Sequence, residues 1–194
     1  MDKFSYSIGL GIGQNLMSMG ARDIDADDFA QAVKDVLKGG PTAISHKEAR
    51  EIVNRYFAEL ERKINADRIS QGKAFLEQNG KREGVVTLKS GLQYEVIRKG
   101  SGKKPKATDR VRCHYEGRLI DGTVFDSSVK RGQPAVFGVS QVIKGWVEAL
   151  QLMSAGDKWK LYIPYNLGYG SQGAGEMIAP YSTLIFEVEL IDVL

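Results

Sequence analysis

The spacing of apolar residues changes along the chain, from helical spacing before residue 82 to strict alternation after residue 85. In the longest periodic segment, Ser45 to about Arg82, apolar residues follow one another at four-residue steps: Ile52, Tyr56, Leu60 and Ile64. This spacing predicts a helix of about 38 residues, or about 57 Å. Ser45 with Glu48 three residues later is a capping box that marks its start. Beyond Asp67 the apolar residues become sparse, so we expect the second half to be a stalk without extensive docking.

Two shorter helices are predicted before it. The first covers residues 6–19 and is interrupted by glycines at alternate positions: Gly9, Gly11 and Gly13. Each interior glycine costs about 1 kcal/mol relative to alanine, so we expect either close approach of another helix or phosphate binding to compensate. Phosphate binding is disfavoured because the spacing fits neither GxGxxG nor a Walker A motif, and no strand precedes it. The second helix begins after Asp25 or Asp27 and ends at Gly39-Gly40.

These helices have more apolar surface than they can bury as an isolated piece of about 65 residues. The stripe of the second helix alone contains four large apolar side chains: Phe29, Val33, Val36 and Leu37. Either the helices pack on the rest of the chain or they pair with a second copy of it. The sparse apolar residues after Asp67 favour the second copy.

After Gly84 the pattern predicts strands and one short helix. Alternating apolar residues mark four strands: Leu92, Tyr94 and Val96; Val111, Cys113 and Tyr115; Trp159, Leu161 and Ile163; and Leu184, Phe186, Val188 and Leu190. Asp121-Gly122 is a tight-turn dipeptide that joins the second of these to a return strand beginning at Thr123. A short helix has one apolar face: Trp146, Ala149, Leu150 and Met153. The predicted class is therefore α+β, with residues 1–84 helical and residues 85–194 an antiparallel half-barrel wrapped on a short helix.

The segment from Val111 to Trp146 is rich in aromatic residues, with Asp126 directly after Phe125. Aromatic residues at these spacings are typical of a plain core. An apolar, aromatic-lined concavity with one carboxylate at its wall is also the usual description of a ligand site. The spacing alone leaves both interpretations open.

Composition excludes several classes of function. The formal charge of +3 over 194 residues is too small to indicate nucleic-acid binding, and no segment approaches the ~20 apolar residues of a membrane span. The only cysteine, Cys113, excludes an intramolecular disulfide and fits a reducing compartment. The two histidines, His46 and His114, lack partners at ligand spacing, so no metal site is expected. The first 14 residues lack the pattern of a signal peptide, which predicts a cytoplasmic location, or a periplasmic or exported one if a signal peptide was removed.

Several motifs in residues 88–194 resemble the FKBP-type peptidyl-prolyl cis-trans isomerases: HYEGRLIDGTVFDSS, VIKGW, GYG and STLIFEVEL, in that order. The helical part and SIGLGIGQNL resemble the subgroup similar to macrophage infectivity potentiator, which has an intertwined helical dimerisation domain followed by a long helix. The resemblance implies an isomerase of X–Pro bonds in folding proteins, with chaperone-like client binding by the N-terminal domain. It implies a homodimer through the N-terminal helices and no cofactor. The alternative is a non-catalytic chaperone or scaffold that keeps the fold.

Residue by residue, the resemblance also implies a site. The residues expected to act on the substrate are Tyr115, Phe125, Asp126, Trp146, Tyr169 and Phe186, and those expected to bind it are Arg131, Phe137, Val142, Ile143 and Ile178. Trp146 forms the floor under the proline ring, Tyr169 donates a hydrogen bond to a substrate carbonyl, and Asp126 polarises the amide region. Tacrolimus and rapamycin are expected ligands. Ala135 and Ala179 depart from the family pattern and bear on inhibitor affinity.

Overall fold

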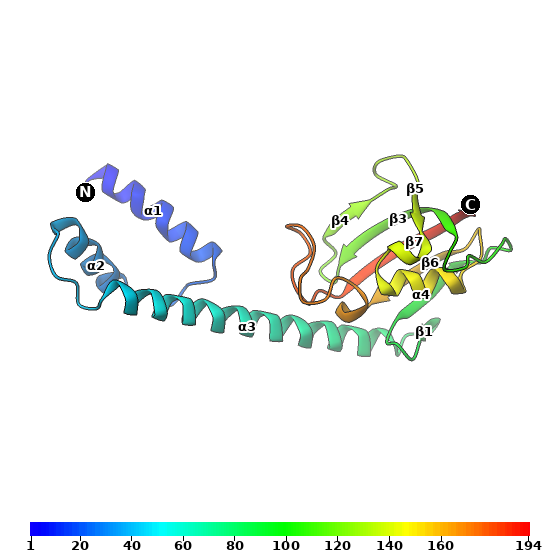
Figure 1. The fold of residues 1–194 in the computed structure, drawn as a ribbon, viewed down its shortest axis with the longest axis horizontal. Coiled ribbons are helices and arrows are strands. Elements are labelled where there is room, and N and C mark those ends of the chain that lie inside the picture. The colour runs from blue at the N-terminus through cyan, green and yellow to red at the C-terminus, as the bar shows by residue number, and fades with distance from the viewer. The chain divides into compact units, whose positions relative to one another are not determined.

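The computed structural model describes all 194 residues and divides into two compact units, Met1–Lys63 and Ile64–Leu194. Helices α1 (Lys3–Ser18) and α2 (Ala26–Lys38) belong to the first unit, and helix α3 (His46–Asn79) continues from the first unit into the second (Figure 1). None of the helices combines the length and the apolar character that crossing a membrane requires. The predicted domain boundary at residues 84 and 85 lies where β1 begins, and it stays a prediction.

Each of these three helices starts after a side chain that accepts hydrogen bonds from backbone N–H groups left free in the first turn. Asp2 accepts from the Ser5 N–H at 2.7 Å at the start of α1. Asp25, rather than Asp27, caps α2, because its carboxylate accepts from the N–H groups of residues 27 and 28. At the start of α3 the Ser45 hydroxyl accepts from the Glu48 N–H at 3.2 Å, as the capping box predicts.

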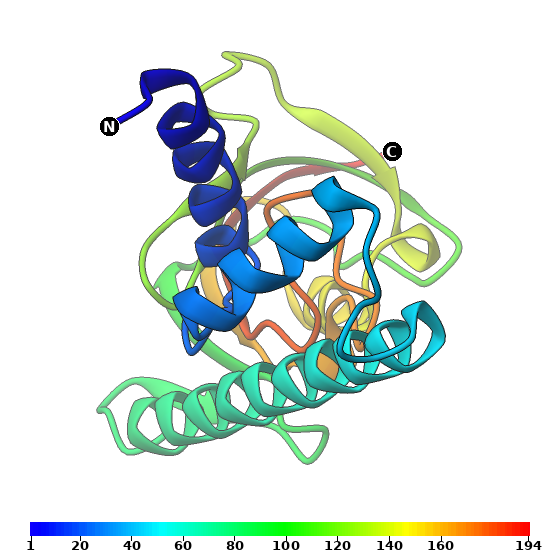
Figure 2. The same ribbon diagram turned by 90° about the vertical axis from the view of Figure 1, so that its left-hand side faces the viewer.

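The apolar side chains of the first unit remain largely exposed. Figure 2 shows α1 and α2 as separate rods connected by the segment 19–25. No residue of either helix is buried, and Phe4 and Leu37 are 74% and 81% exposed. A side chain added at any of the three glycines of α1 would meet nothing within 4 Å. The glycines therefore serve no close helix contact within one chain.

The second unit is built on one antiparallel sheet in the strand order β1-β2-β6-β7-β3-β4, with β5 paired to β3. Its strands are β1 (Val85–Thr87), β2 (Gln93–Arg98), β3 (Arg110–Leu119), β4 (Val124–Ser127), β5 (Ala135–Gly138), β6 (Lys158–Ile163) and β7 (Leu184–Val193). Helix α4 (Lys144–Leu152) lies against the sheet (Figure 1). Short 3₁₀ turns cover Val139–Gln141 and Tyr165–Leu167. The α+β prediction is confirmed.

Alternation along β3 and β7 builds the core between sheet and helix. The inward residues of β3 and β7 are buried, and those of α4 pack onto them: Val111, Cys113, Tyr115, Leu184, Phe186, Val188, Leu190, Trp146, Ala149 and Leu150. A Cβ on Gly145 would lie 2.7 Å from Ile163 Cγ2, so glycine is what allows α4 to approach β6 this closely. The helix is thereby fixed with Trp146 directed into the concave side of the sheet.

The second half of α3 contacts the sheet unit through a small number of side chains, which the expected stalk without extensive docking did not include. Asn79 is buried and donates to the Gln93 side chain at 2.9 Å. Arg82, just after the helix, donates to the Tyr162 hydroxyl at 2.9 Å, and the ring of Phe75 lies 6.1 Å from that of Tyr162. Most of these contacts are polar, which is why the hydrophobic pattern of the sequence does not predict them.

Candidate functional site

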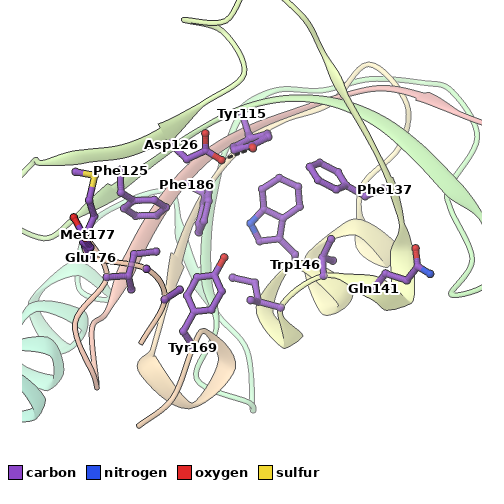
Figure 3. Close-up of a pocket in the computed structure, with 15 residues that line it drawn as sticks. Tyr115, Phe125, Asp126, Phe137, Gln141, Trp146, Tyr169, Glu176, Met177 and Phe186 are labelled. Carbon is purple, nitrogen blue, oxygen red and sulfur yellow. Dashed lines mark hydrogen bonds between the residues drawn. The ribbon is translucent and has the colours of Figure 1, made fainter. Parts of the chain in front are cut away.

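A pocket of about 580 Å³ opens on the concave side of the sheet, over α4. Figure 3 shows aromatic side chains directed into it from several elements. It is lined by every residue that the sequence predicts for the site except Arg131: Tyr115, Phe125, Asp126, Phe137, Val142, Ile143, Trp146, Tyr169, Ile178 and Phe186. The interpretation as a ligand pocket is therefore favoured over that of a plain core, although several of these rings also pack in the core.

Strand alternation, the segment at the start of α4 and the loop between β6 and β7 place these side chains. Tyr115 and Phe186 are inward residues of the neighbouring strands β3 and β7, and Phe125 and Asp126 come from β4. Phe137 belongs to β5. The other lining residues come from the start of α4 and from the loop between β6 and β7: Val142, Ile143, Trp146, Tyr169 and Ile178.

Trp146 forms the centre of the pocket wall and is only 3% exposed. The rings of Tyr115, Phe137 and Phe186 lie 5.4, 5.7 and 5.3 Å from it, each nearly perpendicular to the indole. Edge-to-face pairs at these distances are favourable because the positive edge of one ring meets the negative face of another. The indole is therefore held in one orientation by rings from three strands.

Gly117 makes room for the rings of Phe125 and Phe186. A Cβ at this position would lie 2.5 Å from Phe125 and 2.7 Å from Phe186. The two phenylalanine rings pack edge to face at 5.4 Å across this space. Any side chain at residue 117 would displace one of them from the pocket wall.

Asp126 is the one carboxylate in the wall that is held by neighbouring side chains. The Tyr115 hydroxyl donates to it at 2.5 Å, and the Arg131 guanidinium forms an ion pair with it and donates to the Tyr115 hydroxyl at 2.9 Å. Burial raises the pKa of Asp126, but the hydrogen bonds from Tyr115 and Arg131 and the charge of Arg131 outweigh burial. The net pKa lies below the usual value, so Asp126 is ionised at neutral pH. Arg131 lies behind the pocket wall and holds Asp126.

Tyr169 supplies the second polar group of the pocket. Its hydroxyl forms no hydrogen bond within the chain, and the residue is 38% exposed. Burial, followed by the negative charge of Asp126, raises the pKa of its hydroxyl. The hydroxyl therefore keeps its proton at neutral pH and is free to donate a hydrogen bond to a bound molecule.

Sequence reasoning missed five lining residues: Gln141, Ala174, Gly175, Glu176 and Met177. Figure 3 shows Glu176 and Met177 near Phe125 at one end of the pocket and Gln141 beyond Phe137 at the other. Four of the five lie in the glycine-rich loop after β6, where no periodicity indicates which side chains face inward. Gln141 immediately precedes the predicted Val142 in the sequence, and this adjacency is the only signal that could have indicated it.

The chemistry available here is binding and polarisation rather than covalent attack. The pocket combines an apolar aromatic floor, the ion-paired carboxylate of Asp126 and the free hydroxyl donor of Tyr169. No group of three or more His, Cys, Asp or Glu side chains in residues 1–194 is arranged to hold a metal ion. Such a pocket fits an uncharged, apolar group that carries a carbonyl.

Comparison with known proteins agrees with this geometry. The family model of the FKBP-type peptidyl-prolyl cis-trans isomerases matches residues 101–191, and that of the domain amino-terminal to such isomerases matches residues 1–96. The FKBP-type 22 kDa peptidyl-prolyl cis-trans isomerase of Escherichia coli K12 is 48% identical over 98% of this chain and 94% of its own. Outer membrane protein MIP of Legionella longbeachae is 43% identical over 99% and 85%. The crystal structure of FkpA from Escherichia coli superposes with a TM-score of 0.80 at 35% identity, covering 98% and 95%.

Proposed function

Since this chain belongs to the family of FKBP-type peptidyl-prolyl cis-trans isomerases, we propose that its isomerase reaction takes place in the aromatic pocket over α4. The observation that carries the proposal is the combination of Trp146, ionised Asp126 and the free Tyr169 hydroxyl around one apolar cavity. The chain is an enzyme, and its substrates are X–Pro bonds. The alternative of a non-catalytic scaffold is therefore not retained.

The reaction needs a site that fits a twisted amide better than a planar one. Rotation about a peptide bond crosses a barrier of about 18–20 kcal/mol because it breaks amide resonance, and an X–Pro bond rotates unaided in tens to hundreds of seconds. Twisting moves negative charge from the carbonyl oxygen back to nitrogen. An apolar cavity favours this less polar state, since water favours the planar dipole. Binding that is stronger in the twisted state lowers the barrier.

In this proposal Trp146, Tyr169 and Asp126 each have a role in that discrimination. The indole of Trp146 lies under the proline ring, and the Tyr169 hydroxyl donates to a carbonyl of the substrate chain. The Asp126 carboxylate disfavours the resonance form that places negative charge on the oxygen of the rotating amide. Tyr115 and Arg131 hold Asp126 in place, and this matters because a partly buried carboxylate without partners is costly.

We expect tacrolimus and rapamycin to inhibit the enzyme in competition with peptide, because each presents a pipecolyl ring and a dicarbonyl to the pocket. Inhibition should be measured with a protease-coupled assay on a Leu-Pro or Phe-Pro tetrapeptide, and binding by the fluorescence change of Trp146 at one ligand per chain. A macrocycle without the pipecolyl ring is the control. Saturating tacrolimus that leaves the isomerase rate unchanged would show that the reaction takes place elsewhere.

We also propose that the chain forms a homodimer through α1, α2 and the first turns of α3. The support is the exposed apolar surface of these helices and the match of residues 1–96 to the family's amino-terminal domain. The three glycines of α1 have open space around them within one chain, which a closely approaching second helix could occupy.

A client-binding surface between two such units gives the proposed chaperone-like activity. A client held there reaches the pocket by intramolecular encounter, at effective concentrations up to about millimolar.

Ile12→Glu should convert the dimer to a monomer, since the charge would be buried without a partner in the proposed interface. Sedimentation equilibrium at low micromolar concentration should give the mass of one chain, 21.4 kDa, for the variant and twice that mass for the parent. The variant should isomerise a tetrapeptide at the parent rate but accelerate a proline-limited refolding reaction much less.

Gln14→Glu is the matched control, because residue 14 is polar and exposed and lies about 200° around the helix from residue 12. It should remain dimeric. A parent protein that sediments at the mass of one chain would contradict the dimer. If the Ile12→Glu monomer refolds the protein substrate as fast as the parent does, the chaperone role of the N-terminal unit is wrong.

The cytoplasmic location stays a proposal. Its support is Cys113, the only cysteine, which is buried and unpaired, as expected of a protein from a reducing compartment. The relative from Legionella longbeachae, by contrast, is named an outer membrane protein. Cell fractionation against marker proteins distinguishes a cytoplasmic from a periplasmic or exported enzyme.

A further inference from the structure

One loop, residues 168–183, supplies six residues of the pocket wall, including Tyr169 and Ile178. Internal hydrogen bonds close it into a fixed shape. Ala174 and Ile178 exchange backbone bonds of 2.8 and 3.1 Å, and the Tyr181 N–H donates to the Gly170 carbonyl at 2.8 Å. The residues around 180 and 181 therefore form the base of the loop, next to Ile178 on one side and to Tyr169 on the other.

Helix α3 contacts this base at two points. The Arg68 guanidinium donates to the Pro180 carbonyl at 2.9 Å and to the Asn65 side chain at 3.1 Å. Gly72, one turn further on the same face of the helix, is buried against Thr183. A Cβ at Gly72 would lie 2.4 Å from the Thr183 hydroxyl oxygen and 3.3 Å from its Cβ. The contact therefore depends on one arginine and on the absence of a side chain.

The loop base has a backbone conformation that needs such support. Tyr181 has φ of 61°, and it is the only residue other than glycine with a positive φ. This region is sterically unfavourable for a residue with a Cβ. Residues keep such conformations only where several contacts fix them, and here the neighbours are the Tyr165 ring at 5.3 Å and the Arg68–Pro180 hydrogen bond one residue away.

We propose that Arg68 is a positioning residue of the isomerase. With the Gly72–Thr183 contact, its hydrogen bond to Pro180 holds the loop 168–183 in the conformation that directs Tyr169 and Ile178 into the pocket. The proposal rests on the assignment of this pocket as the isomerase site. It makes the second half of α3 part of the machinery that binds the substrate, although no residue of α3 lines the pocket.

A loop that loses its anchor populates other conformations, and only the remaining fraction binds substrate. The apparent dissociation constant rises by the inverse of that fraction, whereas the bound complex, once formed, reacts as before. Arg68→Met in the full-length chain should therefore raise KM by about tenfold, a change that the loss of one hydrogen bond to a charged group can produce, and leave kcat unchanged. The Kd for tacrolimus should rise by the same factor. Hydrogen exchange should accelerate at the Ala174, Ile178 and Tyr181 amides but not in β3 or β7.

Arg62→Met is the matched control, because Arg62 is exposed on the same helix and has no ion pair or hydrogen bond. It should leave KM, kcat and loop exchange at parent values. A loss of folded protein alone would lower the apparent kcat at constant KM. An unchanged KM for Arg68→Met, or an equal rise for Arg62→Met, would overturn the proposal.

A second pair of substitutions tests the other contact without touching Arg68. Gly72→Ala should raise KM because the added methyl group meets Thr183, and combining it with Thr183→Ala should restore most of the parent KM. A parent-like KM for Gly72→Ala, or no recovery in the double variant, would count against positioning by the helix. Tyr169→Phe distinguishes the assignment of the pocket from the positioning role of Arg68. If it is impaired while Arg68→Met is not, only the positioning role is wrong, whereas full activity of Tyr169→Phe overturns the site assignment and the positioning role together.

Discussion

Asp126→Ala should lower kcat/KM for a Leu-Pro tetrapeptide by about tenfold to a hundredfold, which corresponds to about 1.4–2.7 kcal/mol of lost transition-state stabilisation. The carboxylate is the only ion-paired acid in the pocket wall, and Tyr115 and Arg131 fix its position. Its removal takes away the charge proposed to disfavour the planar amide and leaves the Tyr115 hydroxyl without its acceptor. A protease-coupled assay measures the rate, and circular dichroism checks the fold.

Two further measurements separate charge from shape. Asp126→Asn keeps the volume of the side chain but not the charge, so it should be impaired nearly as much as Asp126→Ala. Because the pKa of Asp126 lies below its ordinary value of about 3.9, titration of this group should not reduce the rate of the parent enzyme between pH 6 and 8. The stability that its ion pair contributes is present above the unfolded-state pKa and is lost as pH falls through the folded-state value. Full activity of Asp126→Ala would show that the carboxylate is misassigned.

Trp146→Ala should lower the free energy of unfolding by about 3–5 kcal/mol, the usual cost of removing a large aromatic side chain from a core. The residue is 3% exposed and contacts three other rings. Activity and tacrolimus binding should be lost even at temperatures where the variant remains folded, because the floor of the pocket is gone. Urea unfolding followed by near-ultraviolet circular dichroism, which reports aromatic packing, measures the change in stability.

Trp159→Ala provides a comparison within the same sheet unit. Trp159 is 6% exposed and stacks on Tyr94 at 4.2 Å, but it does not line the pocket. Its removal should cost a similar free energy of unfolding and, below the melting temperature, leave ligand binding largely intact. Equal loss of ligand binding in the two variants would mean that Trp146 supports the fold without forming the binding floor.

The pocket could be predicted from the sequence to the extent that regular strands build it. Tyr115 and Phe186 belong to series of apolar residues at every second position of β3 and β7, so period-2 spacing places them on the inward face. Resemblance then supplied the residues that periodicity leaves ambiguous, such as Tyr169 and Ile178 in the loop. Glu176 and Met177 were not predicted as pocket residues, because the direction of a side chain in a glycine-rich loop depends on turns that the spacing of residues does not indicate.

The contact of α3 with the sheet unit was not predicted from the sequence, for another reason. Hydrophobic periodicity registers contacts made by large apolar side chains, whereas this contact depends on Arg68, Gly72 and Asn79. The sequence alone does not distinguish a helix glycine that allows close packing from one that only lowers the stability of the helix. The three glycines of α1 and Gly72 of α3 therefore look equivalent in sequence, although only Gly72 has a neighbour within contact distance.

Cys113 gives the chain a practical property. It is fully buried, and burial raises the pKa of its thiol to about 12, so the thiol stays protonated at neutral pH. Because the thiolate is the reactive form, the native chain should be nearly inert to maleimides and mild oxidants. A cysteine introduced on the surface of α1 or of the loop 168–183 would then carry a spectroscopic label at that position alone, with the native residue left in place.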